Sequence, residues 1–416
     1  MSIASDRVAA WAAADATLSR LGIDDEAPID IYDAIDDAGL FLSFRPLENL
    51  LGFAIPEGRG VVVTTRRPRT IKRFTAAHEL GHCVMHKGLV LDGEQEILGS
   101  SSVEQERQAQ MFAAYFLLPP PLSYRLAEFY GIDEGIASPG QIYQAARDAG
   151  VSFEALTRHF TVLDILSPQD LNRLIDRRHT AKSEASFGIN PHNGHADVWP
   201  IVPSEETESI EVVLGDEIIV SLPENRTTGY MWMSSSDNQR RSQSRPAPAP
   251  PVVGGSPSRA RQIPSSVEPL PRPTGTPSKR SIQPENYRRS VQSFGNSENE
   301  LRVLSETYRS GPLQRPHQIE ATRRARSQGN EEFGRAAGGG GEHLVVLRAA
   351  LDGNLARTFF YATPWRSDEA PLAEWTLNVT CLPGEFEQRK LQILSTNIDD
   401  RHDDDPSDDD VFGTVE

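Results

Sequence analysis

The sequence predicts an α+β chain with more than one domain: a mainly helical first domain, then a β-sandwich that carries a long insertion. Three observations support this prediction. Two stretches near the start repeat apolar side chains at a helical period. Two later stretches alternate apolar and polar residues, as strands do. Between those two lies a long run of Ser, Pro, Arg and Gly that cannot bury a core.

The first helical stretch covers residues 70–85 and contains a motif of chemically reactive side chains. Its apolar face consists of Phe74, Ala77, Leu80, Gly81 and Val84. We expect Thr70 to cap the start of this helix and Gly88 to end it. Within it stands His78-Glu79-Leu80-Gly81-His82, an H-E-x-x-H motif at the edge of the apolar face.

The motif predicts a metal site. Residues four apart share one face of a helix, so the imidazoles of His78 and His82 can reach one ion. Glu79 follows the first ligand directly, where its carboxylate can hold and deprotonate a water molecule. Two nitrogen ligands, an open position and a carboxylate base are typical of a zinc peptidase, so we expect Zn²⁺ as the cofactor.

The second helical stretch, residues 104–118, supplies candidates for the third ligand that such a site needs. Pro119 and Pro120 stop this helix. Glu106 lies three residues before Ala109 and therefore on the inner face, whereas Glu104 is closer to the helix start. His86, one turn beyond His82, is the alternative third ligand.

The two segments together, RFTAAHELGH and EQERQAQMFAAYFLLPP, resemble the ImmA/IrrE family of metallopeptidases. Its usual pattern is RFTxAHELGH followed by ExxANxFAAxLLMP. A glycine-containing hairpin over residues 52–60 and a strand over 61–63 also fit. The resemblance covers residues 1–175, implies a mainly helical zincin-like domain, and assigns Glu106 as third ligand and Glu79 as base. Gln110 and Leu118 depart from the pattern without removing a ligand.

The resemblance also implies a substrate: a DNA-bound helix-turn-helix repressor or antitoxin, cut in a stress, toxin–antitoxin or mobile-element response. The alternative is a non-catalytic binding protein that inhibits papain-type cysteine peptidases and has only a structural metal domain.

The pattern of residues in the second half of the sequence predicts strands. Alternation is clear at 210–213 and 217–222, and again at 344–349, 356–361 and 374–380. Several short strands at regular spacing predict an antiparallel sandwich.

Three loops of this region resemble those of the chagasin-like inhibitors of papain-type cysteine peptidases. They are Asn225–Tyr230, Gly338–Gly341 and Thr363-Pro364-Trp365, in the family's order. The resemblance implies an all-β immunoglobulin-like sandwich over residues 205–385. It also implies six candidate inhibitor-loop residues: Thr227, Thr228, Gly229, Gly340, Gly341 and Trp365. Arg226 stands where the family has proline, which is expected to loosen the first loop. Thr363 stands in place of an arginine.

The remaining segments are expected to be connections. Residues 176–204 form a linker, 239–297 a disordered insertion, and 386–416 an acidic disordered tail. The net charge of −17 argues against direct nucleic-acid binding. No apolar run is long enough for a membrane helix, and the N-terminus reads as an amphipathic helix rather than a signal peptide. Cys83 and Cys381 are too few for a disulfide framework, which favours the cytoplasm.

Overall fold

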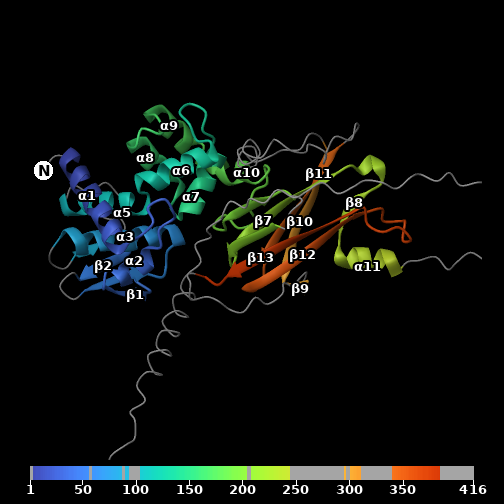
Figure 1. The fold of residues 1–416 in the computed structure, drawn as a ribbon, viewed down its shortest axis with the longest axis horizontal. Helices are drawn as coiled ribbons and strands as arrows, with labels where there is room; N and C mark the ends of the chain where they lie inside the picture. Colours follow the sequence, from blue (N-terminus) through green and yellow to red (C-terminus); the bar gives the residue numbers. More distant parts are fainter. Residues whose placement is uncertain are drawn as a thin grey trace, which may run out of the picture.

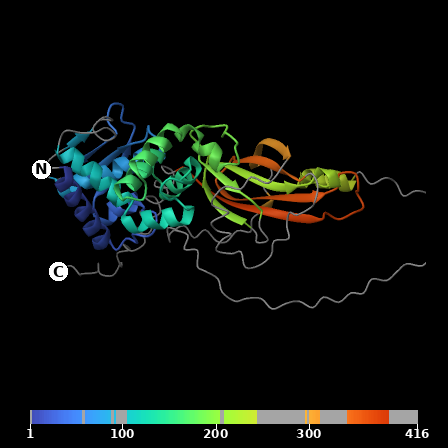
Figure 2. The same ribbon diagram turned by 90° about the horizontal axis from the view of Figure 1, so that it is seen from above.

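The computed structural model describes residues 3–55, 59–86, 90–92, 104–203, 208–243, 295–296, 300–310 and 340–384. These residues form a helical first domain and a β domain that follow one another along the long axis of the molecule (Figure 1, Figure 2). Most of the expected insertion and the whole acidic tail lie outside the described residues. In the described part, no helix is both long and apolar enough to span a bilayer.

The first domain combines helices with one small sheet. Its helices are α1 (Ile3–Leu21), α2 (Ile31–Asp37), α3 (Arg69–Met85), α5 (Glu104–Leu117), α6 (Pro120–Tyr130), α7 (Pro139–Ala149), α8 (Phe153–Val162) and α9 (Pro168–Asp176). Its strands are β1 (Phe41–Arg45), β2 (Gly52–Ile55), β3 (Gly60–Thr64) and β4 (Val90–Asp92), in the order β1-β3-β2-β4. The expected hairpin is therefore present as β2 and β3.

Helix α3 begins one residue earlier than the expected cap. Pro68 holds the N-cap position and makes no side-chain cap bond, while Thr70 lies within the helix. Proline is tolerated at the start of a helix because the first N–H groups there have no partner within the helix. The helix ends at Met85, before the expected stop at Gly88, which lies outside the described residues.

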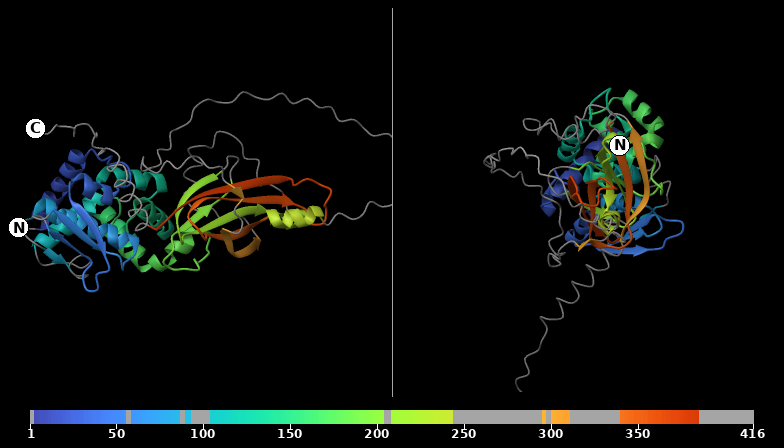
Figure 3. Two further views of the ribbon diagram at one scale, coloured as in Figure 1. Left: turned by 90° about the horizontal axis from the view of Figure 1, so that it is seen from below. Right: turned by 90° about the vertical axis from the view of Figure 1, so that its right-hand side faces the viewer.

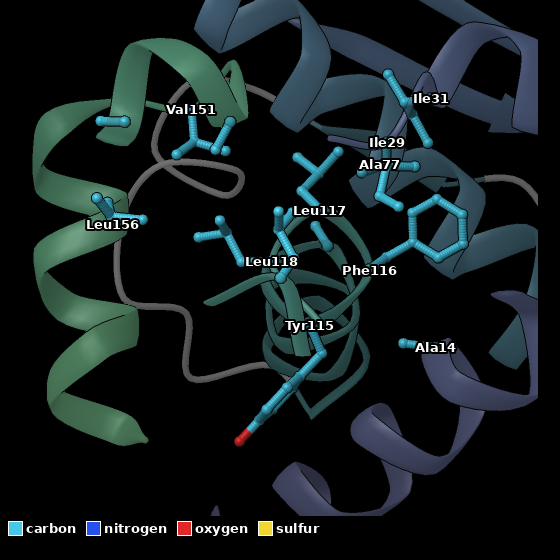
Figure 4. Packing of buried hydrophobic residues seen from close by; sticks show 14 of the residues in the cluster. Ala14, Ile29, Ile31, Ala77, Tyr115, Phe116, Leu117, Leu118, Val151 and Leu156 are labelled. Atoms are coloured by element: carbon cyan, nitrogen blue, oxygen red, sulfur yellow. The ribbon is translucent and has the colours of Figure 1, made fainter. Parts of the chain in front are cut away.

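The core of the first domain is organised around α5. Phe112 and Phe116 are fully buried on it, and their rings stack with centroids 5.5 Å apart. In Figure 4, α5 lies between α8, which contributes Leu156, and the elements that carry Ala14 and Ile31. Because each buried Phe contributes about 1.5–3 kcal/mol, α5 is a main support of the domain.

The β domain consists of two mixed sheets. The first has the order β10-β11-β7-β5 and the second the order β6-β13-β12-β8, with β9 also paired to β12. The strands are β5 (Val198–Ile201), β6 (Glu208–Val213), β7 (Glu217–Glu224), β8 (Met231–Ser234), β9 (Gly295–Asn296), β10 (Leu301–Ser310), β11 (Gly341–Ala349), β12 (Gly353–Ala362) and β13 (Ala373–Leu382). The two sheets share one apolar core, to which Val220, Leu347, Phe359 and Leu377 contribute.

The expected strands are present, but their pairing is not purely antiparallel. β5 pairs with β7 in parallel, and β6 pairs with β13 in parallel. The reason is that the chain crosses to the other sheet as β6 between β5 and β7, so β5 and β7 enter their sheet from the same end.

Two connecting segments contain more structure than the sequence analysis expects. The linker segment 176–204 holds η1 (Arg178–Thr180), α10 (Ala181–Ala185) and β5. The start of the insertion holds the end of α11 (Ser235–Gln243), which is capped by the hydroxyl of Ser234.

Helix α11 is held by polar contacts instead of an apolar face. Arg241 is buried and donates from Nη1 to the carbonyls of Arg366 and Glu369, at 2.9 and 3.0 Å. A polar sequence without helical periodicity is therefore held against the β domain by tertiary contacts, among which those of Arg241 are buried.

The two domains meet at α7, α10 and β5. Tyr143 of α7 donates a hydrogen bond to Asp197 Oδ1 (2.8 Å) and accepts one from the N–H of Val198 (3.0 Å). Arg147 donates to the carbonyl of Val198 (2.7 Å) and lies 3.9 Å from the centre of the Trp199 ring. Figure 3 shows green helices of this part of the chain next to the sheets.

Apolar side chains complete this junction. They come from both domains and form one buried cluster: Tyr143, Ala181, Ala185, Phe187, Val198, Ile219, Leu344 and Val346. β5 is therefore a strand of the β domain that also exchanges hydrogen bonds with α7, while α10 packs against α7.

We predict that Tyr143→Phe destabilises the junction. The substitution leaves the buried N–H of Val198 without its acceptor, which costs about 1–3 kcal/mol. Urea denaturation followed by tryptophan fluorescence should show a lower midpoint. Tyr124→Phe is the control, because that hydroxyl is exposed and its bond to Leu163 is 3.5 Å long. Equal midpoints for the two variants would contradict the prediction.

Candidate metal centre

The two histidines of the motif converge as expected. His78 and His82 lie one turn apart on α3, both fully buried, with their Nε2 atoms 3.1 Å apart. Both imidazoles therefore present the same nitrogen to one point.

Helix α5 brings the third group because it lies unusually close to α3. A side chain at Gly81 would place its Cβ 3.0 Å from the Phe112 ring and 3.3 Å from Cα of Ala109. This contact sets α5 against the histidine-bearing face of α3. Glu106 is one turn before Ala109 on α5 and so lies opposite the two histidines.

Glu106 completes a compact cluster. Its Oε2 lies 3.3 Å from His78 Nε2, and its Oε1 lies 3.5 Å from His82 Nε2. Burial opposes ionisation of this carboxyl, but its close contacts with His78 and His82 outweigh burial and lower the pKa of Glu106. In the described part of the chain, no second group of three His, Cys, Asp or Glu side chains converges in this way.

The spacing of the three groups suits zinc. Ligand atoms about 2.0–2.1 Å from a tetrahedral ion lie about 3.3 Å from one another. The three separations in the cluster are 3.1, 3.3 and 3.5 Å. The donor set of two imidazoles and one carboxylate is also one that zinc accepts. His78, His82 and Glu106 therefore fit a zinc ion.

His86, the alternative ligand, lies on the far side of His82. Its Nδ1 is 3.0 Å from Nδ1 of His82, and its Nε2 is 3.0 Å from Oε1 of Gln108. His86 thus contacts the nitrogen of His82 that faces away from the cluster. Burial lowers the pKa of His86. Cys83 also stays outside the cluster, and burial raises the pKa of its thiol to about 12, which keeps it protonated.

Glu79, the candidate base, lies against strand β2. A Cβ built at Gly52 would be 2.7 Å from Oε1 of Glu79, 2.6 Å from Cγ2 of Thr75 and 2.8 Å from the carbonyl of Val62. Glu79 is fully buried. The absent side chain at Gly52 is what leaves room for this carboxylate.

The candidate inhibitor loops gather at one end of the β domain. Gly341 pairs with Glu224 at the end of β7, directly before the loop that contains Thr227 and Thr228. A Cβ at Gly229, whose φ is 82°, would lie 2.7 Å from the Trp365 ring. The first and third loops are therefore in contact, and Gly341 begins the neighbouring strand β11, with Gly340 directly before it.

The first loop is held more firmly than its sequence suggests. Arg226, expected to loosen it, donates from Nε to Oε1 of Glu224 (2.6 Å) and lies 3.9 Å from the centre of the Tyr308 ring. The side chain of Asn225 accepts from the N–H of Thr227 at 3.2 Å. Trp365 is 70% exposed, which leaves most of its ring available to a partner.

Glu224 is a residue that the sequence analysis missed. Its buried carboxylate also accepts from the N–H of Trp232 (2.9 Å) and lies 3.5 Å from Nδ1 of His343. These contacts, with burial opposing them, lower the pKa of Glu224 and raise that of His343 to about 9. An acidic residue on the inward side of a strand is the signal that could have found it.

The loops and the metal cluster lie far apart. β7 starts at Glu217, next to the junction, and ends at Glu224, next to the loops. In Figures 1 and 3 the orange-red loop between β12 and β13 lies at the end of the β domain that points away from the first domain. The loops therefore do not cover the metal cluster of their own chain.

The helical fold and the three-ligand cluster define a metallopeptidase-like first domain. In agreement, residues 38–161 match the model of the IrrE N-terminal-like domain, Peptidase_M78, and this segment includes all of His78, Glu79, His82 and Glu106. The family resemblance of the first domain is thereby confirmed.

Solved structures similar to the chain include three relevant proteins. The cysteine protease inhibitor EhICP2 from Entamoeba histolytica has 12% identity and a TM-score of 0.22, with 46% of this chain and 100% of that chain covered. Amebosin has 12% identity, a TM-score of 0.18 and coverages of 45% and 98%. The structure of PbICP-C in complex with falcipain-2 has 13% identity and a TM-score of 0.18, with 47% of this chain and 96% of that chain covered. At these TM-scores the superpositions do not define a shared fold. No curated protein matches the chain at a significant level.

We predict that the metal-stripped chain binds one zinc ion. Glu106→Gln should weaken this binding by more than about 100-fold, which exceeds the usual effect of substituting a residue that only contacts a ligand. An amide oxygen is neutral and a poorer ligand than a carboxylate. Competition with a chelating dye measures the affinity. Glu128→Gln, an exposed position on α6, serves as control. Unchanged affinity in Glu106→Gln would exclude Glu106 as a ligand.

Proposed function

We propose that the first domain is a zinc-dependent endopeptidase in which His78, His82 and Glu106 hold the ion and Glu79 is the general base. The observation that carries this proposal is the convergence of two imidazoles and a carboxylate, with the buried Glu79 directly following the first of these histidines on the same helix. The Peptidase_M78 match supports the same class.

Zinc, when bound, polarises a scissile carbonyl and makes water a stronger acid. The chain supplies the rest. Glu79 accepts a proton from the attacking water and later donates it to the leaving amine. Because the side chain of Glu79 extends from α3 to the space beside Gly52 of β2, its carboxylate has little freedom to turn away. Orientation of this kind is what a general base requires.

We propose that the substrate is a helix-turn-helix repressor or antitoxin, cleaved in a stress or mobile-element response. This assignment rests on the family resemblance of the first domain. Incubation of the zinc-loaded chain with repressors encoded beside its gene, followed by mass spectrometry, tests it. The absence of cleavage of every neighbouring repressor would refute this substrate while leaving the metal site intact.

We predict that Glu79→Gln keeps its zinc and loses about 10²–10⁴-fold in turnover, because the amide cannot accept the proton. Gly52→Ala should lower turnover in the same direction, because its Cβ displaces the Glu79 carboxylate. Gly60→Ala, where a Cβ meets nothing within 4 Å, is the matched control on the neighbouring strand. Full turnover in Glu79→Gln would exclude Glu79 as the base.

For the β domain we propose an immunoglobulin-like fold and binding to a papain-type cysteine peptidase, either to inhibit it or to recruit it. Support comes from the gathering of the loops, with exposed Thr227, Thr228 and Trp365 around Gly229. We also propose a cytoplasmic location, in keeping with Cys83 and Cys381 being free thiols.

We predict that the full chain inhibits papain and that Trp365→Ala weakens inhibition by roughly 30-fold, which corresponds to the ~2 kcal/mol of an interface tryptophan. A papain titration with a fluorogenic substrate measures it. Leu351→Ala is the matched control, because Leu351 is also exposed (56%) but follows β11 at the opposite end of the domain. If the wild-type chain does not inhibit at micromolar excess, the inhibitor function is excluded.

A further inference from the structure

A line of polar side chains, all buried except the half-buried His86, runs from the metal cluster to the N-terminal helix. It joins His82, His86, Gln108 and Asp6 through three contacts of 3.0, 3.0 and 2.9 Å. Neither the motif nor the family resemblance explains the contribution of α1 to this line. We propose that Asp6, acting through Gln108 and His86, fixes the tautomer of His82, so that its Nδ1 carries the proton and its Nε2 offers the lone pair. The proposal rests on the zinc site proposed above.

The donor-to-acceptor direction of these hydrogen bonds is set at the Asp6 end of the line. The Gln108 amide nitrogen donates to Oδ1 of Asp6 (2.9 Å) and lies 3.4 Å from Oε1 of Glu104. A carboxylate accepts hydrogen bonds and does not donate them. Two acids on one side of the amide therefore require the NH₂ group there and leave the carbonyl oxygen facing His86.

Asp6 is firmly held in this accepting role. It is fully buried, and Nε of Arg107 donates to its other oxygen, Oδ2, at 2.9 Å. The hydrogen bond from Gln108, followed by that from Arg107, lowers the pKa of Asp6. The carboxylate thus remains charged and cannot reverse its hydrogen bond to the amide.

The donor-to-acceptor direction of each further hydrogen bond, up to the metal cluster, follows from the one before it. The carbonyl of Gln108 can only accept, so Nε2 of His86 must donate to it. In neutral imidazole the other nitrogen is then an acceptor, and Nδ1 of His86 accepts from Nδ1–H of His82. The lone pair of His82 is left on Nε2, the atom that lies 3.1 Å from His78 and 3.5 Å from Glu106.

The opposite tautomer would place a proton where the ion has to bind. A metal-ligating histidine needs its other nitrogen engaged with an acceptor, and loss of that acceptor typically weakens metal binding about 10–100-fold. His86 and its two partners are therefore positioning residues, and the ordered start of α1 becomes part of the metal site.

Two substitutions at Gln108 separate this role from simple packing. Gln108→Met has a similar shape but no acceptor for His86, whereas Gln108→Glu keeps an oxygen acceptor in that place. We expect Gln108→Met to weaken zinc binding by at least about 10-fold and Gln108→Glu by much less. A packing role gives the reverse order, because methionine is tolerated and a third carboxylate beside Asp6 and Glu104 is not. A third variant, Asp6→Asn, removes the charge at the outer end of the line. Asp15→Asn, at an exposed position of α1, is its matched control.

The tautomer can be read directly in the metal-free full chain by ¹⁵N-edited NMR of its histidine rings, with His82→Gln used for assignment and circular dichroism used to verify folding of each variant. We expect an Nδ1–H signal for His82 in the wild type and in Gln108→Glu, and its loss or mixing in Gln108→Met and Asp6→Asn. An Nε2–H signal in the wild type, or an unchanged spectrum and zinc affinity in Gln108→Met, overturns the proposal. Because this measurement needs neither zinc nor turnover, it still decides the matter if the peptidase function fails.

Discussion

The contact between α3 and α5 at Gly81 is the constraint on which the metal cluster depends. The helices approach so closely there that the Phe112 ring and Ala109 backbone leave little space for a side chain. A wider separation would move Glu106 away from His78 and His82, and the three ligand atoms would no longer share one centre. The same packing buries His78, His82 and Glu106, and the contacts among these three side chains offset the cost of removing them from water.

The β domain uses a similar device at its far end. One buried carboxylate, Glu224, joins three elements by accepting from Arg226 and Trp232 and lying beside His343. In both domains, residues from separate elements are therefore positioned by a buried acid and not by apolar packing alone. Such an arrangement is directional, so it fixes the orientation of a loop or a ring as well as its position.

How much the sequence predicts depends on how local each interaction is. The pairing of His78 with His82 follows from their spacing on one helix. Periodicity puts Glu106 on the inner face of its helix, but the family pattern is needed to assign it, and not His86, as the third ligand. Asp6 could not be predicted, because its partner Gln108 is 102 residues away and no local pattern joins them.

The second half shows the same limit. Alternation located the main strands, but β5 is short, contains a proline and looks like a connection; its structure comes from tertiary contacts with Tyr143 and Arg147. α11 was missed because its sequence has no apolar period and it is held by the buried Arg241. Both are cases in which long-range contacts decide the conformation of a segment with weak local preference.

The position of β5 has a consequence for what counts as an autonomous folding unit. The segment that matches the Peptidase_M78 model ends at residue 161, yet α7 within it is hydrogen-bonded to a strand that belongs to the other domain. A chain cut at residue 175 would leave Tyr143 and Arg147 facing solvent, and a chain begun at residue 205 would leave β7 with a bare edge where β5 had been. Recombination of either half with another protein would therefore have to carry β5 along or replace it.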